Sequence, residues 1–158
     1  MSGQDTLGFS GQTACFTKAG LGIGSTPAEL SIAAPNGAGV DFAIDGIGYH
    51  LADDATVVMT AMAVQAVSTS CLYLVELNSS GTLSTKKGVE VLTADLGVVG
   101  GSLQWPQPSA DKCAIGGFKV ALNASTTFTG ATTDLDAAGV TDTYYDFIGG
   151  IPLAPQVS

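Results

Sequence analysis

The sequence contains no arginine, and its basic side chains are limited to five lysines and one histidine. Arginine holds phosphate and carboxylate groups through paired hydrogen bonds, so its absence removes the usual means of binding a phosphate backbone. Against the five lysines stand 14 acidic residues, which gives a formal net charge of −9. This balance argues against nucleic acid as a partner and weakens any interpretation as a phosphoryl-transfer enzyme.

Charge of either sign is scarce, since 12% of the residues are charged, compared with about 25% in typical soluble domains. No apolar run approaches the roughly 18 residues of a membrane-spanning helix, so no membrane is expected as a partner. The start, Met1 to Asp5, lacks the basic and apolar segments of a secretory signal peptide. We expect such a chain to cover much of its surface in an assembly, because obligate interfaces are depleted in charge.

Residues that could carry catalysis are few, and none forms a known constellation. The single histidine, His50, has no Gly-x-Ser-x-Gly nucleophile elbow to serve, so a surface or interface position is the better interpretation. Asp134, Asp136 and Asp142 lack the spacing and the terminal glutamate of an EF-hand calcium loop. The sequence therefore assigns no catalytic residue, no metal ligand and no cofactor.

The three cysteines, an odd number at wide spacing, form neither a disulfide framework nor a zinc-binding pattern. Cys71 and Cys113 fall in apolar runs, which favours buried free thiols that behave as small hydrophobic side chains. A disulfide between these two cysteines is an alternative for an oxidising compartment alone.

The stretch from Ser68 to Lys86 is predicted to form the central β-hairpin. An apolar, β-rich run meets the turn cluster Asn78-Ser79-Ser80-Gly81 and reverses into a threonine-rich run. Alternation divides the apolar side chains of the first strand between two faces: Cys71, Tyr73, Val75 and Leu77 on one, and Leu72 and Leu74 on the other. Because both faces are apolar up to Glu76, we expect this strand to be covered on both sides.

Short β-rich runs with turn signals at close intervals make up the rest of the middle of the chain. Asp45-Gly46 joins two alternating runs and predicts a tight hairpin. Further strands are predicted within residues 56–62, 88–92, 102–105, 115–122, 125–129 and 143–148. A helix is an alternative for residues 59–67, and a single helical turn is expected at 93–96. The fold class predicted from this pattern is all-β: a jelly-roll-like antiparallel β-sandwich with extended N- and C-terminal arms.

The sequence divides into three predicted regions. Residues 1–38 form an extended Gly/Ser/Thr-rich N-terminal arm with at most a short strand at 29–33, residues 39–148 form the β-sandwich domain, and residues 149–158 form an extended C-terminal tail. Large apolar side chains on irregular flanks usually dock onto their own domain or a neighbour. The candidate interaction residues are Phe9, Phe16, Trp105, Ile151 and Leu153.

Trp105 belongs to this set for a different reason. It is the only tryptophan, and it precedes Pro106 at the end of a predicted strand. We interpret its side chain as an anchor in a core or an interface. The alternative is a platform on which a sugar ring stacks.

Four short stretches carry a resemblance that covers roughly residues 40–148. They are Phe42-Ala-Ile-Asp-Gly46, Gln65-Ala-Val-Ser-Thr-Ser-Cys-Leu-Tyr-Leu-Val75, Leu103-Gln-Trp-Pro106 and Cys113-Ala-Ile-Gly116. In these stretches the chain resembles small structural proteins of tailed bacteriophages. The resemblance implies a capsid decoration or cement protein with a jelly-roll-like fold. Its implied partners are the major capsid protein and further copies of itself, as a dimer or trimer. Its implied location is the outer capsid surface of the virion, after synthesis in the host cytoplasm.

Two other classes of function compete with this hypothesis. A phage tail, fibre or adhesin-type β module would bind a host glycan or another structural protein, and would present aromatic side chains around Trp105. An enzyme would need a nucleophile or metal site of its own, for which one histidine and no arginine give little material. We therefore expect a protein without enzymatic activity.

Overall fold

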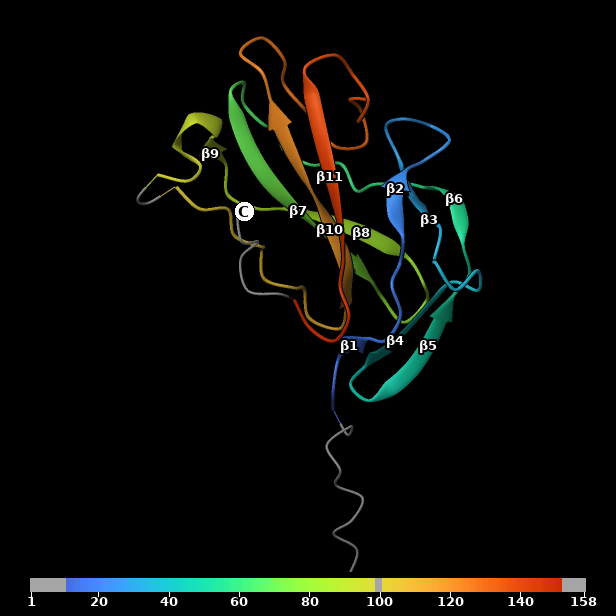
Figure 1. Cartoon of the computed structure of the whole chain (residues 1–158). Helices are drawn as coiled ribbons and strands as arrows, with labels where there is room; N and C mark the ends of the chain where they lie inside the picture. Colours follow the sequence, from blue (N-terminus) through green and yellow to red (C-terminus); the bar gives the residue numbers. More distant parts are fainter. Residues whose placement is uncertain (1–10, 99–100, 152–158) are drawn as a thin grey trace, which may run out of the picture.

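The structure is a computed structural model that describes residues 11–98 and 101–151 (Figure 1). Within these residues the chain is all-β, with antiparallel sheets that pack together, and its one helical element is the 3-10 turn η2 (Thr93–Asp95). The predicted all-β class is confirmed, and the packed sheets agree with a β-sandwich. The same residues contain no helix long and apolar enough to cross a membrane.

The largest sheet has five strands, and its central strand is β7 (Thr69–Leu77). β10 (Cys113–Leu122) pairs with one edge of β7 and carries β11 (Val140–Asp146) on its far side. The other edge of β7 pairs with β8 (Leu83–Lys87) and with the short β9 (Val91–Leu92). Figure 1 shows β7, β10 and β11 running side by side as the long strands of the molecule.

Two three-stranded sheets complete the fold. One has the order β1-β4-β5, with β1 (Ala14–Cys15), β4 (Val40–Ile44) and β5 (Ile47–Leu51). The other has the order β2-β3-β6, with β2 (Leu21–Ile23), β3 (Leu30–Ile32) and β6 (Asp54–Val57). Apolar side chains from all three sheets meet in one main core.

The central hairpin has the predicted faces. Every residue of β7 is buried. Cys71, Tyr73, Val75 and Leu77 point into the main core. Leu72 and Leu74 belong to a second cluster, which also contains Leu103, Trp105, Ala114 and Phe147. The two-sided burial explains why the strand is apolar without alternation.

The Asp45-Gly46 hairpin is also confirmed. β4 and β5 pair from Val40↔Leu51 to Ile44↔Ile47, which leaves two residues in the turn. Both turn residues have positive φ, 51° at Asp45 and 83° at Gly46. This is the type I′ geometry that matches the twist of the flanking strands, and it explains the Asp-Gly pair.

The predicted N-terminal arm needs correction over its described part, residues 11–38. This segment forms β1, β2 and β3 and places Cys15, Ala19 and Leu30 in the main core with no exposed surface. Of the strands in this segment, the sequence indicated β3 alone. Strands of two or three residues leave little local pattern, because they are stabilised by distant partners: β1 by β4 and β3 by β6.

Three further segments differ from the predictions. Residues 59–67 are neither helix nor strand, and their one ladder contact is the isolated bridge from Gln65 to Phe128. That bridge is also the one β contact of the predicted strand at 125–129, and residues 102–105 have none. These segments pack on the sheets mainly through side chains, so their strand-like sequence patterns do not lead to strand pairing. The predicted helical turn at 93–96 is confirmed as η2.

The three cysteines are free and buried. In the sheet register Cys71 lies opposite Val120, whereas Cys113 lies opposite Leu77 at the other end of β7. At about 3.3 Å per strand residue, the two cysteines are separated by roughly 20 Å along the sheet. A disulfide needs Cα atoms within about 7 Å, so the alternative of a Cys71–Cys113 bridge is excluded.

Candidate binding groove beside Trp105

A groove of about 810 Å³ lies where the segment before β10 passes residues 149–151. Its lining includes Trp105 and Ile151, so the structure brings together two of the five candidate interaction residues. Both side chains also belong to, or pack against, the second apolar cluster. Phe9 and Leu153 lie outside the described residues.

Trp105 forms the floor of this region and is held on three sides. Its ring meets the rings of Tyr145 and Phe147 edge to face, with centroid separations of 5.6 and 5.0 Å. Below it lies Gly117, where a Cβ atom would stand 2.3 Å from Trp105 Cζ3 and 2.5 Å from the carbonyl oxygen of Tyr73. With 9% of its surface exposed, Trp105 has the burial of an anchor, and it offers little ring face for stacking a sugar.

The loop that forms the groove wall is fastened to the β7–β8 hairpin by polar contacts. The carboxylate of Glu76, which is 1% exposed, accepts hydrogen bonds from Ser109 N at 2.8 Å and Ser109 Oγ at 3.2 Å. Lys86 Nζ donates to the carbonyl oxygen of Gln107 at 2.6 Å, and Lys112 Nζ donates to Ser84 Oγ at 2.7 Å. These contacts fix the wall before any ligand arrives, which lowers the ordering cost of binding.

The groove offers hydrogen-bonding groups around an apolar floor. Amide, hydroxyl, carboxylate and ammonium groups line it, from Gln104, Gln107, Ser109, Asp111 and Lys112. Such a lining suits a peptide segment or the hydroxyl groups of a sugar. Cys113 also borders the groove, but burial raises the pKa of its thiol to about 12, so this cysteine stays protonated and is a poor nucleophile.

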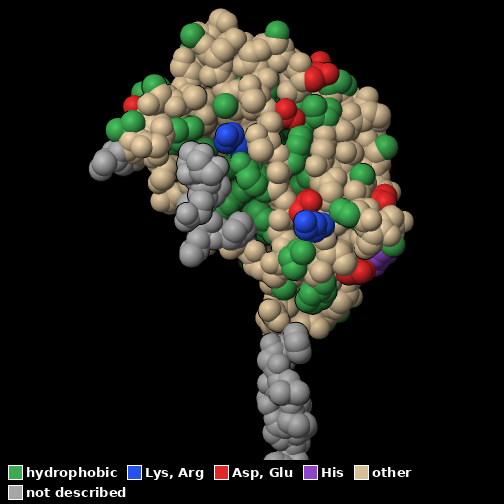
Figure 2. Space-filling view, in the orientation of Figure 1, with side chains coloured by type: hydrophobic (Ala, Val, Ile, Leu, Met, Phe, Trp, Pro, Cys, Tyr) green, Lys and Arg blue, Asp and Glu red, His purple; other side chains and the backbone are tan. Residues whose placement is uncertain are grey.

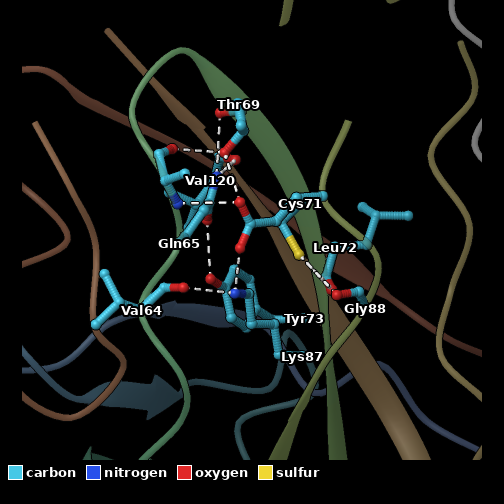
Figure 3. A network of polar contacts seen from close by, with 11 residues as sticks. Val64, Gln65, Thr69, Cys71, Leu72, Tyr73, Lys87, Gly88 and Val120 are labelled. Carbon is cyan, nitrogen blue, oxygen red and sulfur yellow. Dashed lines mark hydrogen bonds and ion pairs between the residues drawn. The ribbon is translucent and has the colours of Figure 1, made fainter. Parts of the chain in front are cut away.

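A second polar cluster lies deep between β7 and β10 (Figure 3). Gln65 has no exposed surface. Its side-chain oxygen accepts a hydrogen bond from Tyr73 Oη at 2.8 Å, and its Nε2 donates to the carbonyl oxygens of Thr69 and Val120, each at 3.1 Å. Burial raises the pKa of Tyr73 far above its usual value. Since each group has a partner and the phenol stays neutral, the cluster is structural and holds the segment at 64–66 against the sheet.

The same segment is fastened at the surface by Glu90. Its carboxylate accepts hydrogen bonds from Ala66 N at 3.0 Å and from the ammonium group of Lys87. Burial alone would raise the pKa of Glu90, but the hydrogen bonds from Lys87 and Ala66 outweigh it and lower the pKa below its usual value. Lys87 Nζ also donates to the carbonyl oxygen of Val64 at 2.8 Å, so one ion pair holds both ends of the segment.

The remaining candidates lie apart from the groove. Phe16 follows β1 and is 48% exposed, and its backbone N–H donates to the carbonyl oxygen of Asp41 at 2.8 Å. His50 lies on the surface, as the sequence predicted, with Nδ1 2.8 Å from Asp41 Oδ1. Over residues 11–98 and 101–151, no group of three or more His, Cys, Asp or Glu side chains is placed to hold a metal ion.

The sequence did not indicate the roles of three residues that position the groove and the core: Gln65, Glu76 and Gly117. Glu76 stands inside an apolar run, and its partner Ser109 is 33 residues away. Gly117 falls within the strand predicted at 115–122, and no local pattern shows why glycine stands there. The ladder is irregular between Ala114 and Gly116, but the specific need for glycine at 117 is the approach of Trp105. The one sequence signal for a buried hydrogen-bond partner was a polar residue, Glu76, in an otherwise apolar strand.

The chain matches no known protein family, no curated protein and no solved structure. Its function is therefore inferred from its own residues.

Proposed function

We propose that this chain is a non-enzymatic virion structural protein, a capsid decoration or cement protein that binds the outer capsid surface and stabilises the shell. The observation that carries the proposal is the exposure of nine large apolar side chains within the described residues, from 38% at Val67 to 76% at Val89. They are Phe16, Ile47, Val58, Val64, Val67, Val89, Leu92, Val98 and Ile148. A surface with many exposed apolar groups and few charges is suited to being covered by neighbours.

The distribution of charge supports the same proposal. In the face drawn in Figure 2, uncharged surface predominates and charged side chains are few. The partners would be the major capsid protein and further copies of this chain. A jelly-roll-like β-sandwich would present a rigid surface to the shell, as the bacteriophage resemblance implies.

Four of the exposed side chains belong to two neighbouring segments, and we call them the 64–92 apolar patch: Val64, Val67, Val89 and Leu92. They are 56%, 38%, 76% and 54% exposed, respectively. The segments are held together by the contacts of Lys87 with Val64 and of Glu90 with Ala66. β9 pairs Leu92 with Thr69, just after Val67. A patch on a fastened backbone is a suitable docking surface for a capsid protein.

The location is tested by immunogold electron microscopy of virions purified from the culture that produces the protein. Gold on the icosahedral shell is expected. Gold confined to the tail would replace the capsid assignment by the tail alternative. Virions without gold, prepared alongside a labelled major capsid protein, would overturn the proposal of a virion protein.

The docking surface is tested by the occupancy of purified protein on capsids that lack it. Val89→Asp places a charge at the most exposed residue of the 64–92 apolar patch, and we expect it to lower occupancy at least about tenfold. Ile148→Asp is the matched control, because Ile148 is 59% exposed but lies outside the patch. Equal occupancy of the two variants would show that another surface binds the shell.

One observation favours the alternative of a tail, fibre or adhesin module that binds a host glycan. The groove beside Trp105 combines an apolar floor with amide and carboxylate groups, a common lining of sugar sites. In that case Gln107 and Asp111 would carry the hydrogen bonds, since Trp105 is largely buried. A glycan array would give a signal that Asp111→Asn removes.

A further inference from the structure

β5 is an edge strand, because the order of its sheet is β1-β4-β5. Figure 1 shows it at the periphery of the molecule, with β4 on one side alone. Its residues Ile47, Gly48 and His50 are exposed, and Tyr49 and Leu51 are half-buried. An exposed edge presents unpaired backbone groups to which another strand can add.

The hairpin register shows which backbone groups are unpaired. In a two-residue hairpin the residues flanking the turn, here Ile44 and Ile47, form a hydrogen-bonded pair, and pairs then alternate along the ladder. The pair Asp41↔His50 is therefore not hydrogen-bonded, which agrees with the carbonyl oxygen of Asp41 accepting from Phe16 on the β1 side. It follows that Gly48 and His50 point their N–H and C=O groups outward, where they have no partner among the described residues.

Gly48 has no role within its own chain that requires glycine. Four glycines lie in the described strands: Gly22, Gly48, Gly116 and Gly117. A Cβ atom would meet another atom at 3.2 Å or less at the other three, whereas nothing lies within 4 Å of the position at Gly48. Its φ lies outside the positive range as well. Glycine inside a strand weakens it and often marks the close approach of another backbone.

The edge strands β8, β6, β1 and β2 each carry a charged residue or a covering contact. β8 carries Lys86 and Lys87, and β6 begins with Asp54. Cys15 of β1 exchanges backbone hydrogen bonds with Gly149, and Leu21 N of β2 donates to Asp146 of β11. β5 contains no lysine, no proline and no bulge, which are the usual devices against edge pairing.

We propose that β5 is a self-association edge, on which the β5 strand of a second copy pairs antiparallel with Tyr49 opposite Tyr49. This register makes Gly48 and His50 reciprocal hydrogen-bonded pairs across a two-fold axis, with four backbone hydrogen bonds. The imidazole of His50 lies opposite Gly48 of the second copy, where there is no side chain. Ile47, which is 60% exposed, lies opposite Leu51, so apolar side chains meet at both ends.

The self-complementary register is the reason to assign a second copy as the occupant. β5 carries no acidic residue and no lysine, and its one basic side chain, His50, faces Asp41 of its own chain. The paired strands themselves therefore bring no like charges together, although each molecule has a net charge of −9. A contact of five residues a side is small, well under about 1,200 Å² in total, so we expect a weak dimer. A two-fold contact closes at two copies, and it stands independently of the capsid assignment.

The test is sedimentation equilibrium of the full chain at protein concentrations from about 10 µM to about 1 mM. A weak dimer with a contact of this size should change from monomer to dimer over this range. Gly48→Pro removes the outward N–H without removing a hydrogen bond within the monomer. Gly48→Ala is its matched control, since it keeps the N–H and its methyl group would meet nothing within 4 Å in the monomer. Gly48→Lys provides an edge lysine that tests the same contact if the proline variant fails to fold by circular dichroism.

We expect the wild type and Gly48→Ala to dimerise, and Gly48→Pro and Gly48→Lys to associate at least about tenfold more weakly. In the wild type, the amide protons of Gly48 and His50 should gain exchange protection as concentration rises, while Tyr49, already paired with β4, is protected throughout. A wild type that stays monomeric up to about 1 mM overturns the proposal. Unchanged dimerisation of folded Gly48→Lys also overturns it, and would move the contact to another surface.

Discussion

Gly117 is the residue on which the position of Trp105 depends. A Cβ atom there would overlap both the indole ring and the carbonyl oxygen of Tyr73, and a backbone oxygen in a central strand has little freedom to move. We expect Gly117→Ala to lower the free energy of unfolding by about 1–3 kcal/mol, the usual range for overpacking a core. Urea unfolding followed by circular dichroism measures the change. Gly150→Ala is the control, because nothing lies within 4 Å of a Cβ atom at that position.

Glu90 makes stability depend on pH in the acid range. Its pKa is held below its usual value by hydrogen bonds that outweigh the effect of burial. A carboxyl group whose pKa is lower in the folded state stabilises fully above its unfolded pKa, and this contribution is lost as pH falls through the folded pKa. We expect Glu90→Gln to be less stable than wild type at pH 7 by about 0.2–1 kcal/mol, as for partly exposed ion pairs.

This difference in stability between wild type and Glu90→Gln should shrink as the pH falls below the unfolded-state pKa of Glu90 and through its lower folded-state pKa, because the wild-type carboxylate then becomes protonated. Thermal unfolding at a series of pH values measures it. A constant difference across the series would show that Glu90 acts through packing and not through its charge.

At the scale of the elements, β7 determines the fold because both of its faces are buried. Val75 has no exposed surface and lies in the main core. We expect Val75→Asp to destabilise by more than about 3 kcal/mol, because an unpaired carboxylate would have no water around it. Trp105 fluorescence during urea unfolding reports the change. Val89→Asp, at a side chain 76% exposed, should change stability by less than about 0.5 kcal/mol.

The contrast between β7 and β1 shows what the sequence can predict. The β7–β8 hairpin was predicted with the faces of β7, and the β4–β5 hairpin with its Asp45-Gly46 turn, because nine and five residues of pattern adjoin a turn signal. β1 has two residues, and the partner of Ala14 is Ala43 in β4. A two-residue strand leaves no local pattern that predicts its pairing, so residues 14–15 were predicted to belong to the N-terminal arm.

The groove was predictable only in part, because local sequence patterns identify residues but not the contacts between distant ones. The position of the lone tryptophan before a proline identified Trp105, and a large apolar side chain on an irregular flank identified Ile151, but neither pattern shows that the two residues meet. Their proximity arises because β10 and β11 bring residues 113 and 146 to the same end of the sheet. The buried hydrogen bond between Ser109 and Glu76 forms through a tertiary contact, which the periodicity of the sequence does not predict.

At the scale of the whole molecule, the N-terminal boundary of the folded domain is the feature most open to a direct test. A deletion of residues 1–10 leaves every described strand in place, and we expect its cooperative unfolding to persist. A deletion of residues 1–23 removes β1 and β2 together with Cys15, Ala19 and Leu21 from the main core. Differential scanning calorimetry of both deletions and of the full chain makes the comparison.

The larger deletion should abolish the cooperative transition. Leu21 contributes about 1.5–3 kcal/mol as a large buried side chain, and Ala14, Cys15 and Ala19 contribute smaller amounts. β1 also supplies the hydrogen bonds that hold Gly149 next to the groove. The free energy of unfolding of a whole domain is about 5–15 kcal/mol, so the loss of two strands and their core side chains leaves too little stability for a cooperative transition. A sharp transition at an unchanged temperature after deletion of 1–23 would show that this segment is an arm. If the expected result is found, only the deletion of 1–10 can test whether an N-terminal arm contributes to capsid binding, because a longer truncation would lose binding through unfolding.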